Sequence, residues 1–409
     1  MKNGQRFSAL YRRDFRLFWF GQIISLSGTW MHSLAQSWLV YSLTKSPLYL
    51  GIIASAASLP ILLFTLFGGM VADRFPKRNI LIATQSLSML LALSIAVLAQ
   101  TGAIRVWHVG MVAALLGTVN AFDVPTRQAF LAEVVEKADI TNAIALNSAA
   151  FNGARIIGPV IAGFIIAAVG IPACFFLNAA SFIPVIIALT RINARGSTRA
   201  YNKGLLTDMA DGWRFISKEK EILAIMSWIA LFSLLGIPYV TLLPVLAGEV
   251  LDVGATGLSL LMAFAGAGAL IAAMTIAFKG DIRRKGTFIP LSGIVFSLAI
   301  LGISFSSDFR LSLMLILCAG WGVVSFLATS NGFIQQAVPD SLRGRVMSVY
   351  TLVFLGLAPI GNSLIGFTAH LIGTVPSLKL FASACIIGSI LLSRSFKRAF
   401  SQGESLPKE

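Results

Sequence analysis

The sequence predicts an all-α membrane protein with twelve transmembrane helices in two pseudo-symmetric six-helix halves. Three observations support this fold class: the composition, the number of long apolar segments and an internal repeat. Of the 409 residues, 56% are hydrophobic and only 12% are charged, and the mean hydropathy is +0.83. A soluble domain needs a far more polar surface, so we expect most of the chain to lie in a lipid bilayer.

The apolar segments fall into two groups of six. A transmembrane helix needs roughly 20 apolar residues, and each segment ends at charged residues, glycine or proline. The first group covers residues 16–42, 48–72, 79–100, 106–122, 143–169 and 172–190. The second covers residues 222–248, 255–278, 287–305, 310–330, 346–372 and 376–393. The sequence therefore predicts an N-terminal half at 1–190, a cytoplasmic linker at 191–221, a C-terminal half at 222–393 and a cytoplasmic tail at 394–409.

An internal repeat at an offset of 203 residues relates the two halves. The offset maps glycines of the fifth segment onto glycines of the eleventh: Gly153, Gly158 and Gly163 onto Gly356, Gly361 and Gly366. It also maps the connection at 130–135 onto the one at 333–338. Parallel six-helix halves place a binding cavity at their interface and move solutes by rocking against each other. The repeat therefore favours a solute transporter.

Membrane topology explains the net charge of +15, which arises from 32 Lys and Arg against 17 Asp and Glu. Twelve spans leave both termini on one side, and 27 of the basic residues fall on that side. The opposite side carries four, namely Lys45, Arg105, Arg310 and Lys379. By the positive-inside rule both termini are predicted to be cytoplasmic, and the basicity needs no nucleic-acid partner.

Several kinds of chemistry have no support in the sequence. Cys174, Cys318 and Cys385 each stand alone in an apolar segment, so neither a disulfide framework nor a metal site is indicated. There is no G-x-x-x-x-G-K-[ST] loop, so ATP is not expected to be the direct energy source. No nucleophile–base pair is recognisable, which disfavours an enzyme. No cofactor is predicted.

A charged motif, Gly69-Met-Val-Ala-Asp73-Arg74-Phe-Pro-Lys77-Arg78, lies between the second and third spans. Gly69 allows another helix to approach closely, and Asp73 is placed to face the N-terminus of the eleventh helix, where it would hold the cytoplasmic side shut. The alternative is a solvated turn. The corresponding second-half loop at 279–285 keeps the charges but not the spacing. The predicted gating residues are Gly69, Asp73, Arg74, Lys77, Arg78, Asp123, Arg127, Arg343 and Arg345.

A second motif occupies the fifth span, where small residues recur around a proline. It reads Asn152-Gly153-Ala-Arg155-Ile-Ile-Gly158-Pro159-Val-Ile-Ala162-Gly163. Proline kinks a helix and glycine lets it pack tightly. The alternative interpretation is the close packing common to transmembrane helices.

Both motifs resemble signatures of the major facilitator superfamily. The first resembles its helix 2–3 signature and the second the helix 5 signature of its exporters. The stretches 26–30, 38–47, 123–130 and 338–346 are similar to the drug:proton antiporter branch that holds the enterobactin exporter, the macrolide efflux proteins and the transmembrane secretion effectors. The resemblance implies alternating access, outward transport and exchange for protons. It leaves the substrate open among siderophores, antibiotics and lipids.

Arg155 is the basic residue that counting places near the middle of a span, where a charge is functional by default. We expect it either to face the cavity, where it attracts an anionic substrate group or pairs with Asp123, or to snorkel to the cytoplasmic surface. All 17 acidic residues are expected in loops or at span ends, including Asp123. A deep proton-binding carboxylate is therefore not apparent, and His32 is the candidate that titrates near neutral pH, although a structural role is the alternative.

A mixed apolar and aromatic cavity with few charges is predicted, which suits a bulky amphiphile. The predicted lining residues are Gln22, Trp30, His32, Gln36, Asn120, Asn147, Asn152, Tyr239, Trp321, Asn331 and Asn362. The expected function is export of a small amphiphilic molecule by a monomer in a bacterial inner membrane. The rivals are a lipid or solute transporter of the same fold and a non-transporting scaffold or sensor. The charges at Asp73, Arg74 and Arg78 argue against the scaffold.

Overall fold

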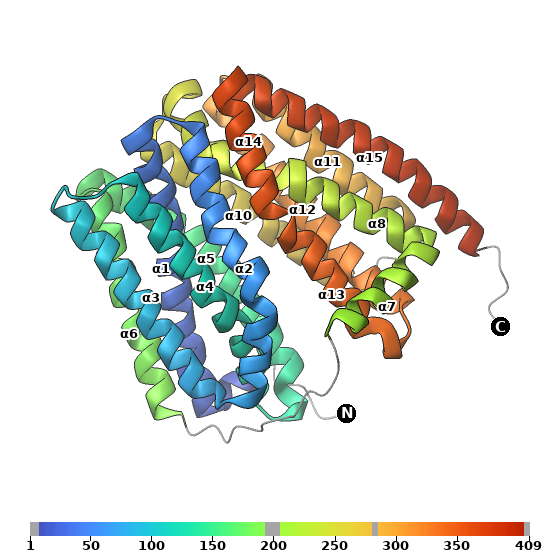
Figure 1. Cartoon of the computed structure of the whole chain (residues 1–409), viewed down its shortest axis with the longest axis horizontal. Helices are drawn as coiled ribbons and strands as arrows, with labels where there is room; N and C mark the ends of the chain where they lie inside the picture. The colour runs from blue at the N-terminus through green and yellow to red at the C-terminus, as the bar shows by residue number, and fades with distance from the viewer. Residues whose placement is uncertain (1–7, 193–204, 280–284, 405–409) are drawn as a thin grey trace. The chain divides into compact units, whose positions relative to one another are not determined.

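A computed structural model describes residues 8–192, 205–279 and 285–404, and within these ranges the regular structure is helical (Figure 1). The predicted linker and tail lie partly outside the described residues, as do residues 280–284 of the charged second-half loop. Several basic residues that entered the topology count, including Lys2 and Arg6, also lie outside them.

Six long helices form the first half of the sequence. A short 3-10 turn, η1 (Ser8–Tyr11), precedes them, and η2 (Lys137–Asp139) leads into the fifth. The helices are α1 (Arg13–Thr44), α2 (Pro47–Arg74), α3 (Lys77–Gln100), α4 (Val106–Leu131), α5 (Ile140–Ala168) and α6 (Ile171–Arg191).

The second half begins with a short helix, α7 (Leu205–Lys218), and its seventh span is interrupted. Pro238 and Pro244 lack a backbone donor, and here the helix changes to π and 3-10 geometry. This span comprises α8 (Lys220–Leu231), η3 (Phe232–Gly236), η4 (Ile237–Leu242), α9 (Leu243–Val245) and η5 (Leu246–Val250). The remaining helices are α10 (Gly254–Lys279), α11 (Lys285–Phe305), α12 (Phe309–Ala337), α13 (Asp340–Gly356), α14 (Ala358–Ile372) and α15 (Thr374–Glu404).

The described residues contain eleven helical stretches that are long and apolar enough to cross a membrane. The seventh span, Lys220–Val250, and the eleventh, Asp340–Ile372, each count as one stretch. Helix α1 has 32 residues but is not among the eleven, because polar side chains such as Gln22, His32 and Gln36 lower its hydropathy. Together these helices match the twelve predicted segments.

Three helices end well beyond the predicted segments, which corrects the boundaries taken from the sequence. The fourth, tenth and twelfth segments are predicted to end at residues 122, 330 and 393, but α4 continues to Leu131, α12 to Ala337 and α15 to Glu404. The polar residues that suggested span ends lie inside these helices, where neighbouring helices supply hydrogen-bond partners. A polar residue therefore did not mark the end of a span.

The backbone carries the 203-residue repeat. Helices α4 and α12 begin at Val106 and Phe309, which the offset relates. Helices α6 and α15 each follow a glycine with positive φ, 100° at Gly170 and 91° at Gly373. Only glycine adopts this conformation without strain, so the same turn is conserved in both halves.

The chain forms two compact units, and each unit includes a short segment from the other half of the sequence. Among the described residues, the first unit takes those of Met1–Lys45, Ala56–Tyr201 and Gly254–Ala263. The second takes those of Ser46–Ser55, Asn202–Val253 and Phe264–Glu409. Helices α2 and α10 therefore each contribute to both units.

Candidate functional site

The first unit encloses a cavity of about 510 Å³ between α1, α3, α4, α5 and α6. Five of the residues predicted to line a cavity do so here: Trp30, His32, Asn120, Asn147 and Asn152. Apolar lining comes from Leu26, Leu116, Val124, Phe151 and Phe182. Amide and hydroxyl groups alternate with these apolar surfaces, so the cavity offers an amphiphile both kinds of contact.

Arg127 is the charged residue of this lining, and a buried carboxylate lies behind it. Asp123 is one helical turn earlier on α4 and is only 1% exposed. Its Oδ2 atom pairs with Nη2 of Arg127. Arg127 lines the cavity and Asp123 does not, so the carboxylate affects the cavity through the charge of the pair. The Asp123–Arg127 pair is neutral when Asp123 is ionised.

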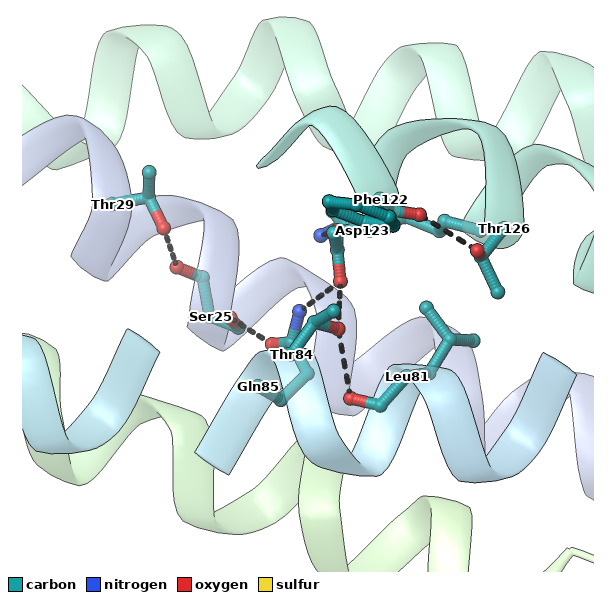
Figure 2. A network of polar contacts seen from close by, with 9 residues as sticks. Ser25, Thr29, Leu81, Thr84, Gln85, Phe122, Asp123 and Thr126 are labelled. Atoms are coloured by element: carbon teal, nitrogen blue, oxygen red, sulfur yellow. Dashed lines mark hydrogen bonds and ion pairs between the residues drawn. The ribbon is translucent and has the colours of Figure 1, made fainter. Parts of the chain in front are cut away.

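Helix α3 supplies the other contacts of the carboxylate, as Figure 2 shows. Thr84 Oγ1 donates to Asp123 Oδ1 at 2.8 Å, and Gln85 Nε2 donates to the same oxygen at 2.7 Å. Hydrogen bonds and a counter-ion are what allow a carboxylate to stay buried and charged.

The network continues into α1. Ser25 Oγ donates to Gln85 Oε1 at 3.3 Å, and Thr29 Oγ1 donates to the Ser25 carbonyl at 2.9 Å (Figure 2). A change of charge at Asp123 is therefore connected by hydrogen bonds to α1 and α3 as well as to α4. We refer to Ser25, Thr84, Gln85, Asp123 and Arg127 as the polar network.

The position of Asp123 corrects the expectation that all acidic residues lie in loops or at span ends. The residue lies eight positions before the end of α4 and is buried. Asp123 and Arg127 are among the predicted gating residues, and their i, i+4 spacing on one helix indicates an ion pair. Sequence reasoning missed Thr84 and Gln85, which contact Asp123 from α3.

One donor at the site has no partner. Arg127 Nε is buried and makes no hydrogen bond within the described chain. Only Nη2 of this side chain meets the carboxylate. An unsatisfied buried donor is unfavourable, so the guanidinium is less stable here than one whose donors are all paired.

His32 is held in a hydrogen-bonded structural position. It is 5% exposed, and its ring packs against the Phe175 ring with 4.9 Å between centroids. Asn178 Nδ2 donates to Nδ1 at 3.2 Å, and Nε2 lies 3.3 Å from Gln36 Oε1. One nitrogen accepting and the other donating is the pattern of a neutral imidazole, which favours the structural alternative.

Three other predicted residues of this unit lie outside the cavity lining. Gln36 contacts His32, and Gln22 is 1% exposed with an unpaired Nε2 within the described chain. Arg155 is half-buried, and its guanidinium carbon lies 5.5 Å from the centre of the Trp30 ring. This cation–π geometry connects α5 to α1.

Two residues of the gating motif, Lys77 and Arg78, make an ion pair and hydrogen bonds within the first unit. Lys77 is buried and pairs with Glu133 at 2.6 Å. Arg78 donates to the carbonyls of Leu189 and Thr190 at 2.7 and 2.8 Å, which satisfies the C-terminus of α6.

The other members of this motif are less constrained. Asp73 is half-buried and Arg74 is exposed, while a Cβ atom on Gly69 would meet no atom of the described residues within 4 Å. A contact between Asp73 and the eleventh helix therefore stays a prediction.

The second-half gating residues make ion pairs within their own unit. Arg343 pairs with Asp340 at 2.6 Å and donates to the Gln335 carbonyl at 2.9 Å. Arg345 pairs with Asp211 at 2.8 Å, which joins α7 to the start of α13.

The glycines of the fifth-span motif differ in what they pack against. A Cβ atom on Gly158 would lie 2.6 Å from both the Ser27 carbonyl oxygen and Trp30 Cβ, and one on Gly163 would overlap the Ser259 hydroxyl. A Cβ atom on Gly153 would meet nothing within 4 Å. Pro159 lies inside α5. Close packing thus explains Gly158 and Gly163 but not Gly153.

The predicted lining residues of the second half belong to the other unit and not to this cavity. Tyr239 packs against Phe296 and Trp321 against Phe288, with ring centroids 6.2 and 6.1 Å apart. Asn331 Oδ1 accepts from Gln335 at 2.6 Å, and Asn362 Oδ1 accepts from Thr241 at 3.1 Å.

Known proteins share this architecture along nearly the whole chain. A family model described as transmembrane secretion effector matches residues 5–409. The staphyloferrin A transporter of Staphylococcus aureus is 26% identical over 381 residues, which cover 91% of this chain and 93% of that protein. The multidrug efflux pump Tap of Mycolicibacterium fortuitum is 26% identical over 373 residues, which cover 87% and 88%.

A solved structure supports the fold independently. The nucleoside transporter NupG superposes with a TM-score of 0.77 at 13% identity, covering 94% of this chain and 99% of that one. At this identity the likeness shows a common arrangement of helices and nothing of the substrate.

Proposed function

We propose that this chain, which belongs to the transmembrane secretion effector family of the major facilitator superfamily, exports a small amphiphilic molecule in exchange for protons. Membership makes it a multi-pass membrane transporter of small molecules and not an enzyme. Export, the kind of substrate and the use of protons are the proposed parts.

The cavity of the first unit is the observation that carries this proposal. Its volume of about 510 Å³ lies within the range of small-molecule sites, and its lining combines aromatic rings with amides and one guanidinium. A siderophore-like or drug-like molecule presents a similar mixture of apolar surface and polar groups. Two relatives are named for molecules of these kinds, one as a staphyloferrin A transporter and the other as a multidrug efflux pump.

Outward direction is supported by the resemblance of the fifth-span motif around Pro159 to the exporter signature, and by a relative whose name is a multidrug efflux pump. We propose that the protein works by alternating access as a monomer in a bacterial inner membrane with both termini cytoplasmic. The halves at 1–190 and 222–393 rock against each other and are joined by the cytoplasmic linker at 191–221. The tail at 394–409 is also cytoplasmic. Asp73, Arg74 and the arginines at 343 and 345 close the cytoplasmic side in one state of the cycle.

Accumulation measurements test the function. An efflux-deficient bacterium expressing the protein is loaded with siderophores, macrolides, cationic dyes or lysolipids, with and without a protonophore. We expect one class to accumulate less when the protein is intact and to recover with the protonophore. Asp73→Asn should lose this effect, while Gly153→Ala, which meets no neighbouring atom, should keep it.

Other outcomes would favour the rivals. Greater accumulation of a compound in expressing cells would indicate uptake. A change confined to lysolipids would indicate a lipid transporter. If no class responds despite confirmed expression in the membrane, export of these molecules is wrong and a non-transporting role becomes the better explanation.

A further inference from the structure

We propose that Asp123 is the proton-binding group of the transport cycle and that a positively charged group of the substrate is what the proton replaces. This inference rests on the proposed proton exchange and names the residue and the substrate charge that carry it. It follows from the polar network and from the composition of the cavity wall.

The carboxylate is isolated from water but not from the cavity. Asp123 is 1% exposed, whereas the Arg127 side chain that pairs with it is 20% exposed and lines the cavity. A proton on Asp123 therefore changes the charge that the cavity experiences without itself occupying the space of the substrate.

Few charged groups surround the pair. On α4 the neighbour is Arg127, and α3 presents the uncharged Thr84 and Gln85. On α1 the titratable group of the cavity is His32, held between Gln36 and Asn178. On α5 the charged residue is Arg155, which stacks on Trp30.

Helix α2 approaches α4 at Gly68, where a Cβ atom would overlap the Ala121 carbonyl. Its charged residues, Asp73 and Arg74, lie at the end of the helix. Among the described lining residues Arg127 is the charged one, so Asp123 sets the net charge at the wall.

The sign of the coupling follows from this charge. With Asp123 ionised the Asp123–Arg127 pair is neutral, and a cation can enter the cavity. With Asp123 protonated the pair carries one positive charge at the wall, in a region where charges are weakly screened. A cation is then repelled and an anion attracted. Proton and cation exclude each other, which is the requirement for exchange, whereas an anion would travel with the proton.

The cavity has groups that stabilise a cation without a carboxylate in the lining. Phe151 and Phe182 present aromatic surface, and Asn120 and Asn147 present amide groups. Aromatic faces attract cations, most strongly where water is excluded. The substrate class is therefore an amphiphile with an amine or other cationic group.

A matched pair of probes tests this sign with the purified full-length protein in detergent. Tetraphenylphosphonium and tetraphenylborate have nearly the same size and apolar surface but opposite charge, and neither titrates. We expect the phosphonium to bind more weakly as the pH falls, by up to about tenfold per unit, and to release protons on binding. The borate should show the opposite trend.

In Asp123→Asn, phosphonium binding should become independent of pH. Asp123→Glu keeps a carboxylate and should keep the pH dependence, which separates loss of the proton site from misfolding. The inference is overturned if the phosphonium fails to bind at any pH, if its binding in the intact protein does not depend on pH, or if Asp123→Asn retains the dependence.

Reconstituted vesicles separate the inference from the proposed function. Asp123→Asn should lose transport driven by a pH gradient but keep exchange of labelled for unlabelled substrate. Asp308→Asn makes the same carboxylate-to-amide change at the exposed N-cap of α12, where asparagine also caps a helix, and should keep gradient-driven transport. Gradient-driven transport in Asp123→Asn would contradict the role of Asp123 alone, whereas its absence in the intact protein would contradict proton exchange altogether.

Discussion

At several equivalent positions, the first half of the chain has polar or charged residues and the second half has aromatic residues. At the 203-residue offset, three members of the polar network and their neighbour Thr29 correspond to aromatic residues: Ser25 to Trp228, Thr29 to Phe232, Gln85 to Phe288 and Asp123 to Phe326. The other two members correspond to polar residues, Thr84 to Thr287 and Arg127 to Ser330. Trp228, Phe232 and Phe326 are fully buried. The Phe326 ring lies 5.3 Å from that of Trp228 and 4.9 Å from that of Phe232, measured between centroids.

The two halves therefore share the arrangement of the backbone but not the side chains that fill their interiors. The first unit holds a buried ion pair beside a cavity, while Trp228, Phe232 and Phe326, which we call the aromatic cluster, fill the corresponding space in the second. At these positions the buried ion pair thus belongs to one half alone. The aromatic cluster provides a closely packed support that has no group to protonate.

The largest effect is expected from moving the charge into the wrong half. Phe326→Asp would bury an unpaired carboxylate among Trp228 and Phe232 and would remove their packing partner. The two losses add to roughly 5 kcal/mol or more. We expect almost no monodisperse protein in fluorescence-detected size-exclusion chromatography. Phe326→Leu should lose only about 1 kcal/mol, and equal behaviour of the two variants would contradict the comparison.

The reciprocal change tests the polar network. Asp123→Phe leaves the partly buried Arg127 without its partner and should destabilise the protein by up to about 3 kcal/mol. Adding Arg127→Ser, the residue found at position 330, should restore most of the stability because no charge is then stranded. Thermal unfolding of the two single variants and the double variant in detergent measures this coupling. Additive effects would show that the pair does not act as a unit.

A smaller effect should be common to both halves. Gly158→Ala places a methyl group 2.6 Å from the Ser27 carbonyl oxygen, and Gly361→Ala places one 2.6 Å from the Leu234 carbonyl oxygen. Each should cost about 1–3 kcal/mol through overpacking. Gly153→Ala meets open space and should stabilise its helix by up to about 1 kcal/mol. A large loss at only one of the two packed glycines would mean that the halves are not equivalent here.

The smallest effect is expected at the surface ion pair of α7. Arg345 pairs with Asp211, and the side chains are 29% and 39% exposed. The offset relates Arg345 to Asn142, whose Oδ1 accepts from the Ala9 backbone at 3.2 Å. Arg345→Asn should therefore change stability by less than about 1 kcal/mol. A shift in unfolding temperature as large as that of Gly158→Ala would assign this pair a greater role.

The spans could be predicted because hydropathy directly reflects the solvent that surrounds a helix. Their ends could not always be predicted, since Asp123 looks like a loop residue until its partner Thr84 on another helix is known. For the same reason, only part of the candidate site could be predicted from the sequence. Trp30 and Asn147 face the cavity as expected, but the pairing of Gln85 with Asp123 depends on how α3 packs against α4.

The segments shared between the units make each half of the chain depend on the other. A Cβ atom on Gly366 would lie 2.8 Å from Gly51 Cα, and the equivalent Gly163 packs against Ser259 in the same close manner. The second helix of each half thus rests on the fifth helix of the other. Either half by itself would leave these closely packed surfaces uncovered.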